Sequence, residues 1–466
     1  MTISSAGVGS GLDVKSIVTQ LVAIERQPLQ QLQTTAATIQ TQLSLYGKVK
    51  SQVSALGDAA AVLSGPGGWN VQKASSSNAA AVGVVAGSAA AASALSVSVQ
   101  QLARAQTSAS LGVAAGVAVG AAGTLKIEVG SWSTDAVPVF TPGTSVPISV
   151  VAGDTVRDIA SKINSASAGV TATVLRDGAN ERLVIRSSTT GVAAGFRLDN
   201  PADAGLAALG FKNPSDGASF AGQTALDAKV NINGVAIVSA SNKMVDVVPG
   251  VTLQLNQVTT APAEVTIETD LDVVQKNIQN FVDAYNALNT TIADATKYVA
   301  ATKTGGPLQG DATTLGLQSA LRSMFGSSST GSTFSRLSDV GIERQTDGSL
   351  KINSTKLSGA QQDLTNLKNL FTTNNNDATT NGFGLKVRDF ARAMVAFDGQ
   401  VTNKSAALQA SITRNSKDQD RVNDRASRVE TQLYKQYSAL DAQMAQLNGL
   451  NSFVTAQLAV WNKPSN

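Results

Sequence analysis

The sequence contains no cysteine and no histidine, and aromatic residues make up only 4% of its 466 positions. Without cysteine, disulfides, thiolate nucleophiles and thiolate metal sites are excluded. Without histidine, the commonest general base near neutral pH and the commonest zinc ligand are missing. An enzyme built on a serine–lysine or a paired-carboxylate site stays open in principle, but no such constellation stands out. We therefore expect a protein that is not an enzyme and that has no cofactor or metal site.

Charge of one sign and long apolar runs are also scarce. The chain has 36 basic and 33 acidic residues, a net charge of +3, and this balance argues against nucleic acid or an anionic membrane as a partner. The sequence has no run of about 18 apolar residues that could span a membrane, and the N-terminus lacks the basic and apolar regions of a Sec signal. These absences alone indicate a cytoplasmic protein, but a chain without cysteine equally suits export through a narrow conduit.

Apolar residues instead repeat at heptad spacing near both ends of the chain. Steps of three and four place such residues along one seam of a helix, which requires a partner helix. The candidate partner of each seam is the other end of the chain, so the pattern predicts an antiparallel helical coiled-coil stem. The N-terminal seam comprises Ile39, Leu43, Tyr46, Val53, Leu56, Ala60 and Leu63, and the C-terminal seam comprises Val422, Ala426, Val429, Leu433, Tyr437, Leu440, Met444 and Leu447.

Prolines and glycines predict where these helices break. A first helical pattern places Ile17, Leu21 and Ile24 on one face, and Pro28 predicts a break near Gln27. The next helix should end at the cluster formed by residues 65–68 (GPGG). No proline occurs between residues 307 and 464, so a long C-terminal helix is sterically allowed.

Between the two ends, from about residue 71 to residue 270, the apolar period changes to two, which is typical of strands. Asn233 and Gly234 between two such runs indicate a type I′ hairpin. One helical segment interrupts the strands, with Asp154 as its expected N-cap, and two strands follow it around the turn at residues 177–180. Residues 112–124, rich in glycine and alanine, predict a flexible loop or a marginal strand.

These patterns predict a multidomain α+β fold in which the stem, formed by both termini, carries inserted β-rich domains. We expect four parts. Residues 1–40 and 441–466 are terminal helical segments, disordered in the free subunit, and residues 41–70 and 273–440 form a helical domain. Residues 71–130 with 226–272 form one β-rich domain, and residues 131–225 form a second that contains the short helix.

The outermost helical segments have little else in the chain to pack against, so their apolar residues are candidates for contacts between subunits. The alternative is ordinary packing within one subunit. The candidate interface residues are Ile17, Leu21, Ile24, Leu32, Ile39, Leu43, Tyr46, Val422, Val429, Leu433, Leu440, Met444, Leu447, Phe453, Leu458 and Trp461.

Several ordered motifs resemble one family, the bacterial flagellar filament cap proteins, also called hook-associated protein 2. The resemblance covers nearly the whole chain and is weakest at residues 105–150 and 200–228. The region 154–191 is similar to a short repeat shared with flagellins. The motifs are SAGVGSGLDV (5–14), LSVSVQQLA (95–103), GVTLQL (250–255), FVDAYN (281–286), LQGD (308–311) and GIERQTDGSL (341–350).

The resemblance implies a homo-oligomer of about four to six copies at the distal tip of the flagellar filament, secreted through the type III apparatus. Its implied partners are flagellin, which folds and inserts beneath the cap, the hook–filament junction proteins and an export chaperone. A surface adhesin that binds host or mucosal glycans is the alternative. Flagellin itself is disfavoured because its usual N-terminal signature is absent.

Overall fold

The computed structural model describes residues 13–135, 137–199, 206–211, 213 and 222–461. The chain divides into two compact units. The β unit comprises residues 70–273, and the helical unit comprises the residues on either side of it. Among the described helices, none combines the length and the apolar character that crossing a membrane requires.

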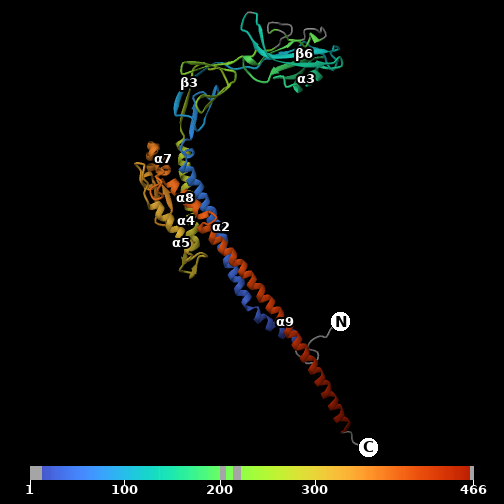
Figure 1. The fold of residues 1–466 in the computed structure, drawn as a ribbon, viewed down its shortest axis with the longest axis vertical. Helices are drawn as coiled ribbons and strands as arrows, with labels where there is room; N and C mark the ends of the chain where they lie inside the picture. Colours follow the sequence, from blue (N-terminus) through green and yellow to red (C-terminus); the bar gives the residue numbers. More distant parts are fainter. Residues whose placement is uncertain (1–12, 136, 200–205, 212, 214–221, 462–466) are drawn as a thin grey trace. The chain divides into compact units, whose positions relative to one another are not determined.

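The helical unit is built from long helices and two small hairpins (Figure 1). Its hairpins are β16 (Tyr298–Val299) with β17 (Thr304–Gly305), and β18 (Ile342–Arg344) with β19 (Leu350–Ile352). Its helices are α1 (Val14–Glu25), α2 (Gln27–Ser64), α4 (Leu271–Thr296), α5 (Ala312–Gly326), α6 (Ser354–Ala360), α7 (Leu364–Thr372), α8 (Phe383–Val395) and α9 (Gln400–Trp461).

The helix breaks lie where proline and glycine predicted them. α1 ends at Glu25 and α2 begins at Gln27, with Pro28 in the first turn of α2. Backbone amides in a first turn have no carbonyl partner within the helix, so proline, which lacks the amide hydrogen, breaks no hydrogen bond there. α2 ends at Ser64, immediately before the GPGG cluster. A Cβ on Gly68 would lie 2.3 Å from the carbonyl oxygen of Val62, so the chain can turn this tightly only with glycine.

The core of the helical unit covers the N-terminal seam. Tyr46, Val53, Leu56, Ala60 and Leu63 are all buried in it, together with residues of α4, α5, α7, α8 and the start of α9. Aromatic rings form its centre. The ring centroid of Phe281 lies 6.1 Å from that of Phe371 and 5.8 Å from that of Phe325, and the centroids of Phe371 and Trp69 are 5.5 Å apart. The seam on α2 therefore packs against residues 274–408 and not against the C-terminal seam, because this globular core already fills the space beside it.

The β unit contains two separate apolar cores. The first is formed by a five-stranded sheet in the order β1-β15-β3-β11-β12 and a three-stranded sheet in the order β13-β14-β2. Its strands are β1 (Gln72–Ser76), β2 (Val82–Ala86), β3 (Ser93–Gln101), β11 (Ala228–Ile232), β12 (Val235–Ser239), β13 (Lys243–Val248), β14 (Val251–Leu255) and β15 (Ala263–Thr269).

The second core packs α3 (Val156–Ser165) against two small sheets. One sheet has the order β10-β6-β7, and in the other β9 pairs with β4, β5 and β8. Its strands are β4 (Thr107–Ala109), β5 (Val113–Ala114), β6 (Gly123–Trp132), β7 (Phe140–Val150), β8 (Val170–Asp177), β9 (Asn180–Ser187) and β10 (Gly195–Asp199).

Two details of the β unit differ from the sequence-based expectations. β4, β5 and β6 pair with β7, β9 and β10, so the second core begins near residue 107 and not at residue 131. The N-cap of α3 is Thr155, whose side chain bonds the amide of Asp158 in a capping box. Asp154 instead accepts hydrogen bonds from the Val151 amide and from Lys162.

The hairpin prediction at Asn233 and Gly234 is confirmed. Both residues have positive φ, +50° and +87°, as a type I′ turn requires. The turn joins β11 to β12, whose residues pair in register from Ile232 and Val235 outward. Residues 112–124 form the short strand β5 and a glycine-containing loop before β6, with positive φ at Gly116 and Gly120.

Candidate assembly surface of the helical unit

α1 is held on α9 by a short apolar seam. Val14, Val18 and Val22 are buried, and they form one cluster with Ala426 of α9. Three half-buried side chains of α9 complete this cluster: Leu433, Tyr434 and Tyr437. The C-terminal seam therefore has a partner near the N-terminus of the chain, but that partner is α1 and not the seam on α2.

Two polar contacts fix the direction of α9 relative to α1 and α2. Arg425 Nε lies 3.0 Å from a carboxylate oxygen of Glu25 at the end of α1. Farther along the chain in α2, the ring of Tyr46 lies 6.0 Å from Lys404 Nζ, near the start of α9. Because the order is reversed on α9, the helices run antiparallel, as Figure 1 shows.

The opposite face of α1 has no covering within the described part of the chain. Leu21 and Ile24, two of the three residues predicted to share a face, are exposed, Ile24 by 58%. Ile17 is half-buried. α1 thus presents apolar side chains on two sides, and only the side formed by Val14, Val18 and Val22 is used within the subunit.

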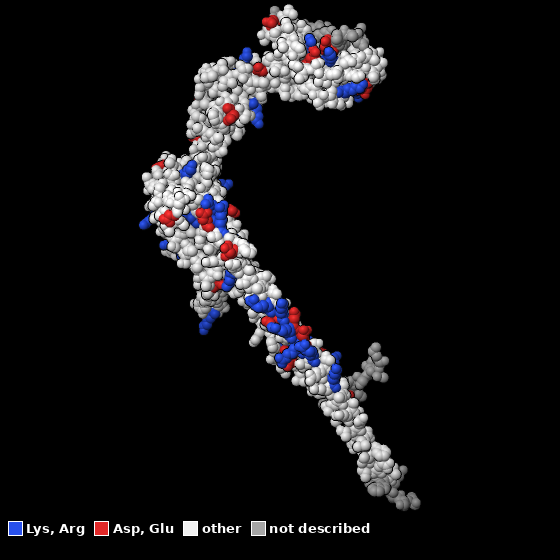
Figure 2. Space-filling model, in the orientation of Figure 1, with Lys and Arg blue, Asp and Glu red and all other residues white. Residues whose placement is uncertain are grey.

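The last part of α9 extends the exposed apolar surface. Past Tyr437, its large apolar side chains are between 43% and 65% exposed, with the half-buried Met444 as an exception. Only Asp441 is charged between Tyr437 and Trp461, and Figure 2 shows the charges gathered higher on the helix. The exposed residues are Leu440, Leu447, Leu450, Phe453, Val454, Leu458 and Val460. Residues 440–460 of α9 are called the α9 tip below.

The remaining candidates fall into two groups. Tyr46 is buried in the core of the helical unit, and Ile39 and Leu43 pack against that core. Leu32, Val422 and Val429 are half-buried, and the side chain of Trp461 lies outside the described part. Sequence reasoning missed Leu450, Val454 and Val460. Leu450 and Val460 lie off the heptad seam, whereas Val454 continues it seven residues after Leu447. Their signal was the near absence of charge, which makes the tip apolar on several sides.

A partly buried polar cluster ties α2, α5 and α9 together near the start of α9. Asp311 caps α5 by accepting from the Thr314 amide at 3.0 Å. It also accepts a hydrogen bond from the Tyr46 hydroxyl, and Lys404 Nζ lies 2.7 Å from its other oxygen. Burial alone would raise the pKa of Asp311, but the bonds from Lys404, Tyr46 and Thr314 outweigh it and lower that pKa to about 2. Burial and the Asp311 carboxylate raise the pKa of Tyr46 well above its usual range.

The motifs 281–286 and 341–350 contribute hydrogen bonds that hold the fold of the helical unit. Tyr285 donates to the Gly348 carbonyl at 2.8 Å. Asn286 exchanges two hydrogen bonds with the backbone of Leu350, each of 2.8 Å. These contacts fasten the β18–β19 hairpin to α4. In the part of the chain that the structure describes, no group of acidic residues could hold a metal ion.

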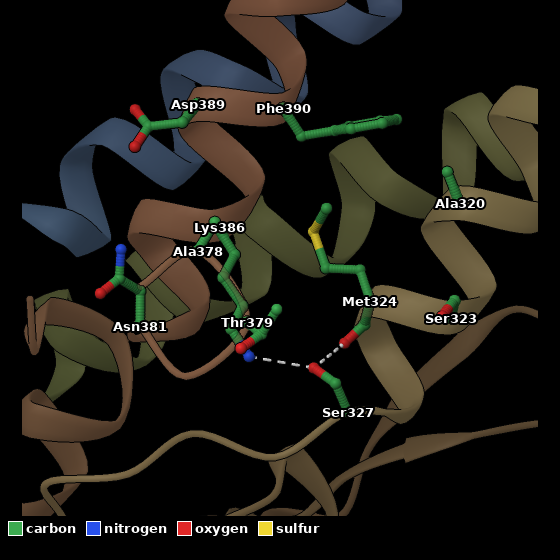
Figure 3. A pocket seen from close by; sticks show the side chains of 10 residues that line it. All are labelled: Ala320, Ser323, Met324, Ser327, Ala378, Thr379, Asn381, Lys386, Asp389 and Phe390. Carbon is green, nitrogen blue, oxygen red and sulfur yellow. Dashed lines mark hydrogen bonds between the residues drawn. The ribbon is translucent and has the colours of Figure 1, made fainter. Parts of the chain in front are cut away.

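A pocket of about 540 Å³ lies between α5, α8 and the loop 373–382 of the helical unit (Figure 3). Met324 and Phe390 supply apolar walls, and Lys386 and Ser327 lie at another side. Lys386 is buried, and its ammonium donates to Ser327 Oγ at 3.0 Å and to the Ser328 carbonyl at 2.7 Å. Burial lowers the pKa of Lys386.

Comparison with known proteins identifies the class to which this architecture belongs. Residues 10–106 match the family model for the N-terminus of flagellar hook-associated protein 2, and residues 225–449 match the model for its C-terminus. Residues 124–189, in the second core of the β unit, match the flagellin hook IN motif. Both ends of the chain thus match the two halves of one kind of protein.

Individual relatives cover the chain almost completely. Flagellar hook-associated protein 2 of Escherichia coli K12 is 28% identical, over 98% of this chain and 98% of the relative. The A-type protein of Pseudomonas aeruginosa is also 28% identical, over 95% and 94%. The crystal structure of the D1-D2-D3 domains of the Escherichia coli flagellar cap protein FliD matches with a TM-score of 0.62 and 26% identity, over 78% of this chain and 99% of that one. The chain belongs to the flagellar hook-associated protein 2 family.

Proposed function

We propose that the chain caps the flagellar filament by inserting its helical ends into contacts with the filament end and with neighbouring copies. The cap function follows from the family, and nothing in the comparisons favours the adhesin alternative. The surface that carries the proposal is the α9 tip, together with Leu21 and Ile24 on α1. It exposes large apolar side chains that the described part of the subunit leaves uncovered.

The arrangement supports a contact that forms and breaks repeatedly. α1 rests on α9 through three valines and one exposed ion pair, so the end of the stem is held by few contacts. In this proposal the exposed seams bind the filament end, release as each exported flagellin folds beneath the cap, and bind again. Export through the type III apparatus agrees with the absence of cysteine, and the paired ends act as a coiled-coil-like stem.

The test is a triple variant of the tip, Leu447→Ser with Phe453→Ser and Leu458→Ser, produced in cells that lack the native chain. Because all three side chains are exposed, the variant should fold. Without the apolar contact, cells should grow no filament and should release flagellin into the medium as monomer. Deleting residues 448–466, or making Leu440, Met444 and Leu447 polar together, should act in the same way.

The matched control is Val235→Ser with Val238→Ser on β12, which removes exposed valines of the β unit, each 62% exposed. Its filaments should be normal. Secretion of the tip variant is measured first, because the same segment is our candidate for binding an export chaperone. Filaments of normal length in cells that secrete the tip variant would contradict the proposal.

A further inference from the structure

Phe397, in the turn between α8 and α9, is 96% exposed, and no other large apolar side chain of the described residues exceeds 70%. A single exposed apolar residue is ordinary, but one held with its whole ring in water on a fixed backbone is a strong candidate for an anchor in an interface. Asp398 follows it, is also exposed, and has no ion-pair partner among the described residues.

The turn that carries Phe397 is held by hydrogen bonds on both sides. The Gly399 amide donates to the Ala396 carbonyl at 2.9 Å. On the far side, Asn403 Nδ2 donates to the Asp398 carbonyl at 2.8 Å, and Thr402 Oγ1 donates to the Val395 carbonyl at 3.0 Å. These hydrogen bonds order the turn within the subunit, and a segment that is already ordered reduces the entropic cost of binding.

The pocket shown in Figure 3 is chemically complementary to this dipeptide. Its volume of about 540 Å³ lies in the range of pockets that hold small molecules, so an aromatic ring fits. Met324 and Phe390 offer apolar contact. Lys386 offers an ammonium that is buried without a carboxylate at ion-pair distance in the described residues. Asp377 acts on it only from farther away and accepts its own hydrogen bonds from Thr379.

We propose that Phe397 of one copy of this chain inserts into the pocket of a second copy, with Asp398 facing the Lys386 ammonium. The anchor and the pocket are different patches of the same helical unit, so the contact is head-to-tail, the kind that generates a ring when its rotation closes. Charge complementarity favours this occupant: the buried Lys386 ammonium has no carboxylate at ion-pair distance among the described residues, and the Asp389 carboxylate that also lines the pocket is paired with Arg388. The inference deepens the proposed function, since it assumes that the chain self-assembles.

The absence of cysteine makes a direct test possible. One preparation of the full chain carries Phe397→Cys, and a second carries Ser323→Cys, at an exposed residue that lines the pocket. Mixed and oxidised, the two should form a disulfide-linked heterodimer. In the matched control the second chain carries Leu315→Cys, on α5 but outside the pocket and 45% exposed, and it should cross-link at least tenfold less.

Self-association gives an independent readout. Phe397→Ser should weaken it by a factor of about ten or more in sedimentation experiments, as loss of an interface anchor does, and Asp398→Lys should weaken it as well. Val62→Ser, which removes an apolar side chain of 45% exposure from α2, should leave it unchanged.

Equal cross-linking with the control, unchanged association of the Phe397 variant, or a chain that stays monomeric at every concentration would overturn the inference. Capture of flagellin instead of a second copy by the cysteine at position 397 would also overturn it. These failures are separable from failure of the cap function: if tip variants abolish filaments while Phe397→Ser cells grow them normally, the cap stands and this contact falls.

Discussion

The seams on α2 and α9 have the same heptad spacing and similar residues, yet the α2 seam is largely buried and the last part of the α9 seam is exposed. Val53, Leu56 and Leu63 on α2 are buried in the aromatic core of the helical unit, whereas Leu440 and Leu447 on α9 are exposed. Between these extremes, Ala426 is buried against Val14, Val18 and Val22 of α1. Periodicity therefore identifies an apolar face, but the other elements decide whether that face stabilises the subunit or remains available to a partner.

The largest expected difference between the seams is in stability. Leu56→Ala should lower the free energy of unfolding of the helical unit by about 2–5 kcal/mol, since it removes buried methyl groups and leaves a cavity. Leu447→Ala, at an exposed position, should change it by less than about 0.5 kcal/mol. Urea unfolding of both variants measures the difference, and a similar loss in the two would contradict the contrast drawn between the seams.

Acid should weaken the covered seam through Asp311. Its pKa is about 2 in the folded chain and near 3.9 in an unfolded one, so the stability that it contributes is present above pH 4 and is lost as the pH falls toward 2. Near pH 2 the free energy of unfolding should be lower by about 2 kcal/mol. The fluorescence of Trp69 should report this loss of stability, measured in a chain in which Trp132 and Trp461 are replaced by phenylalanine so that Trp69 is the remaining tryptophan.

Two variants make this acid test specific. Asp311→Asn should remove the acid-dependent loss, and Tyr46→Phe, which deletes one of the donors to the carboxylate, should remove part of it. Identical pH profiles for these variants and the native chain would rule out Asp311 as the source.

The seam between α1 and α9 should be intermediate in strength. Val18→Ser should weaken the docking of α1 by about 1.5 kcal/mol, because a buried valine is replaced by a polar side chain. Amides of α1 should then exchange hydrogen faster, and trypsin should cleave after Arg26 more readily. Leu21→Ser, on the exposed face of the same helix, is the matched control and should leave both rates unchanged.

The ion pair beside that seam should contribute least. Arg425 and Glu25 are 68% and 30% exposed at their side chains, so replacing Glu25 by Gln should weaken docking by at most about 0.5 kcal/mol, and salt should screen the effect. An effect of Glu25→Gln as large as that of Val18→Ser would show that charge, and not apolar packing, holds α1 in place.

Local chemistry made much of the fold predictable. Pro28, the GPGG cluster and the Asn233-Gly234 turn act through backbone geometry alone, and each marks a boundary that the structure has. The partner of the α2 seam could not be predicted, because contacts with α4 and α8 join residues more than two hundred positions apart. Val14, Val18 and Val22 were missed as the docked face of α1, since this short helix has apolar residues on two sides.

The candidate site divides in the same way. Leu447 was a candidate from its heptad spacing and Phe453 from its place near the end of the chain, and both are exposed. Phe397 and the pocket around Lys386 were not predictable, because a turn residue has no periodicity and a pocket exists only after α5, α8 and the loop 373–382 have come together.

α9 continues without interruption for 62 residues, and its packing on α1 ends at Tyr437. From there the helix rises about 36 Å to Trp461, at about 1.5 Å per residue. This overhang is a lever: a tilt of about 10° at Tyr437 moves the last turn by about 6 Å, slightly more than the roughly 5.4 Å pitch of an α-helix. A small change of angle at the docked segment is thereby converted into a displacement the size of a helical turn at the far end.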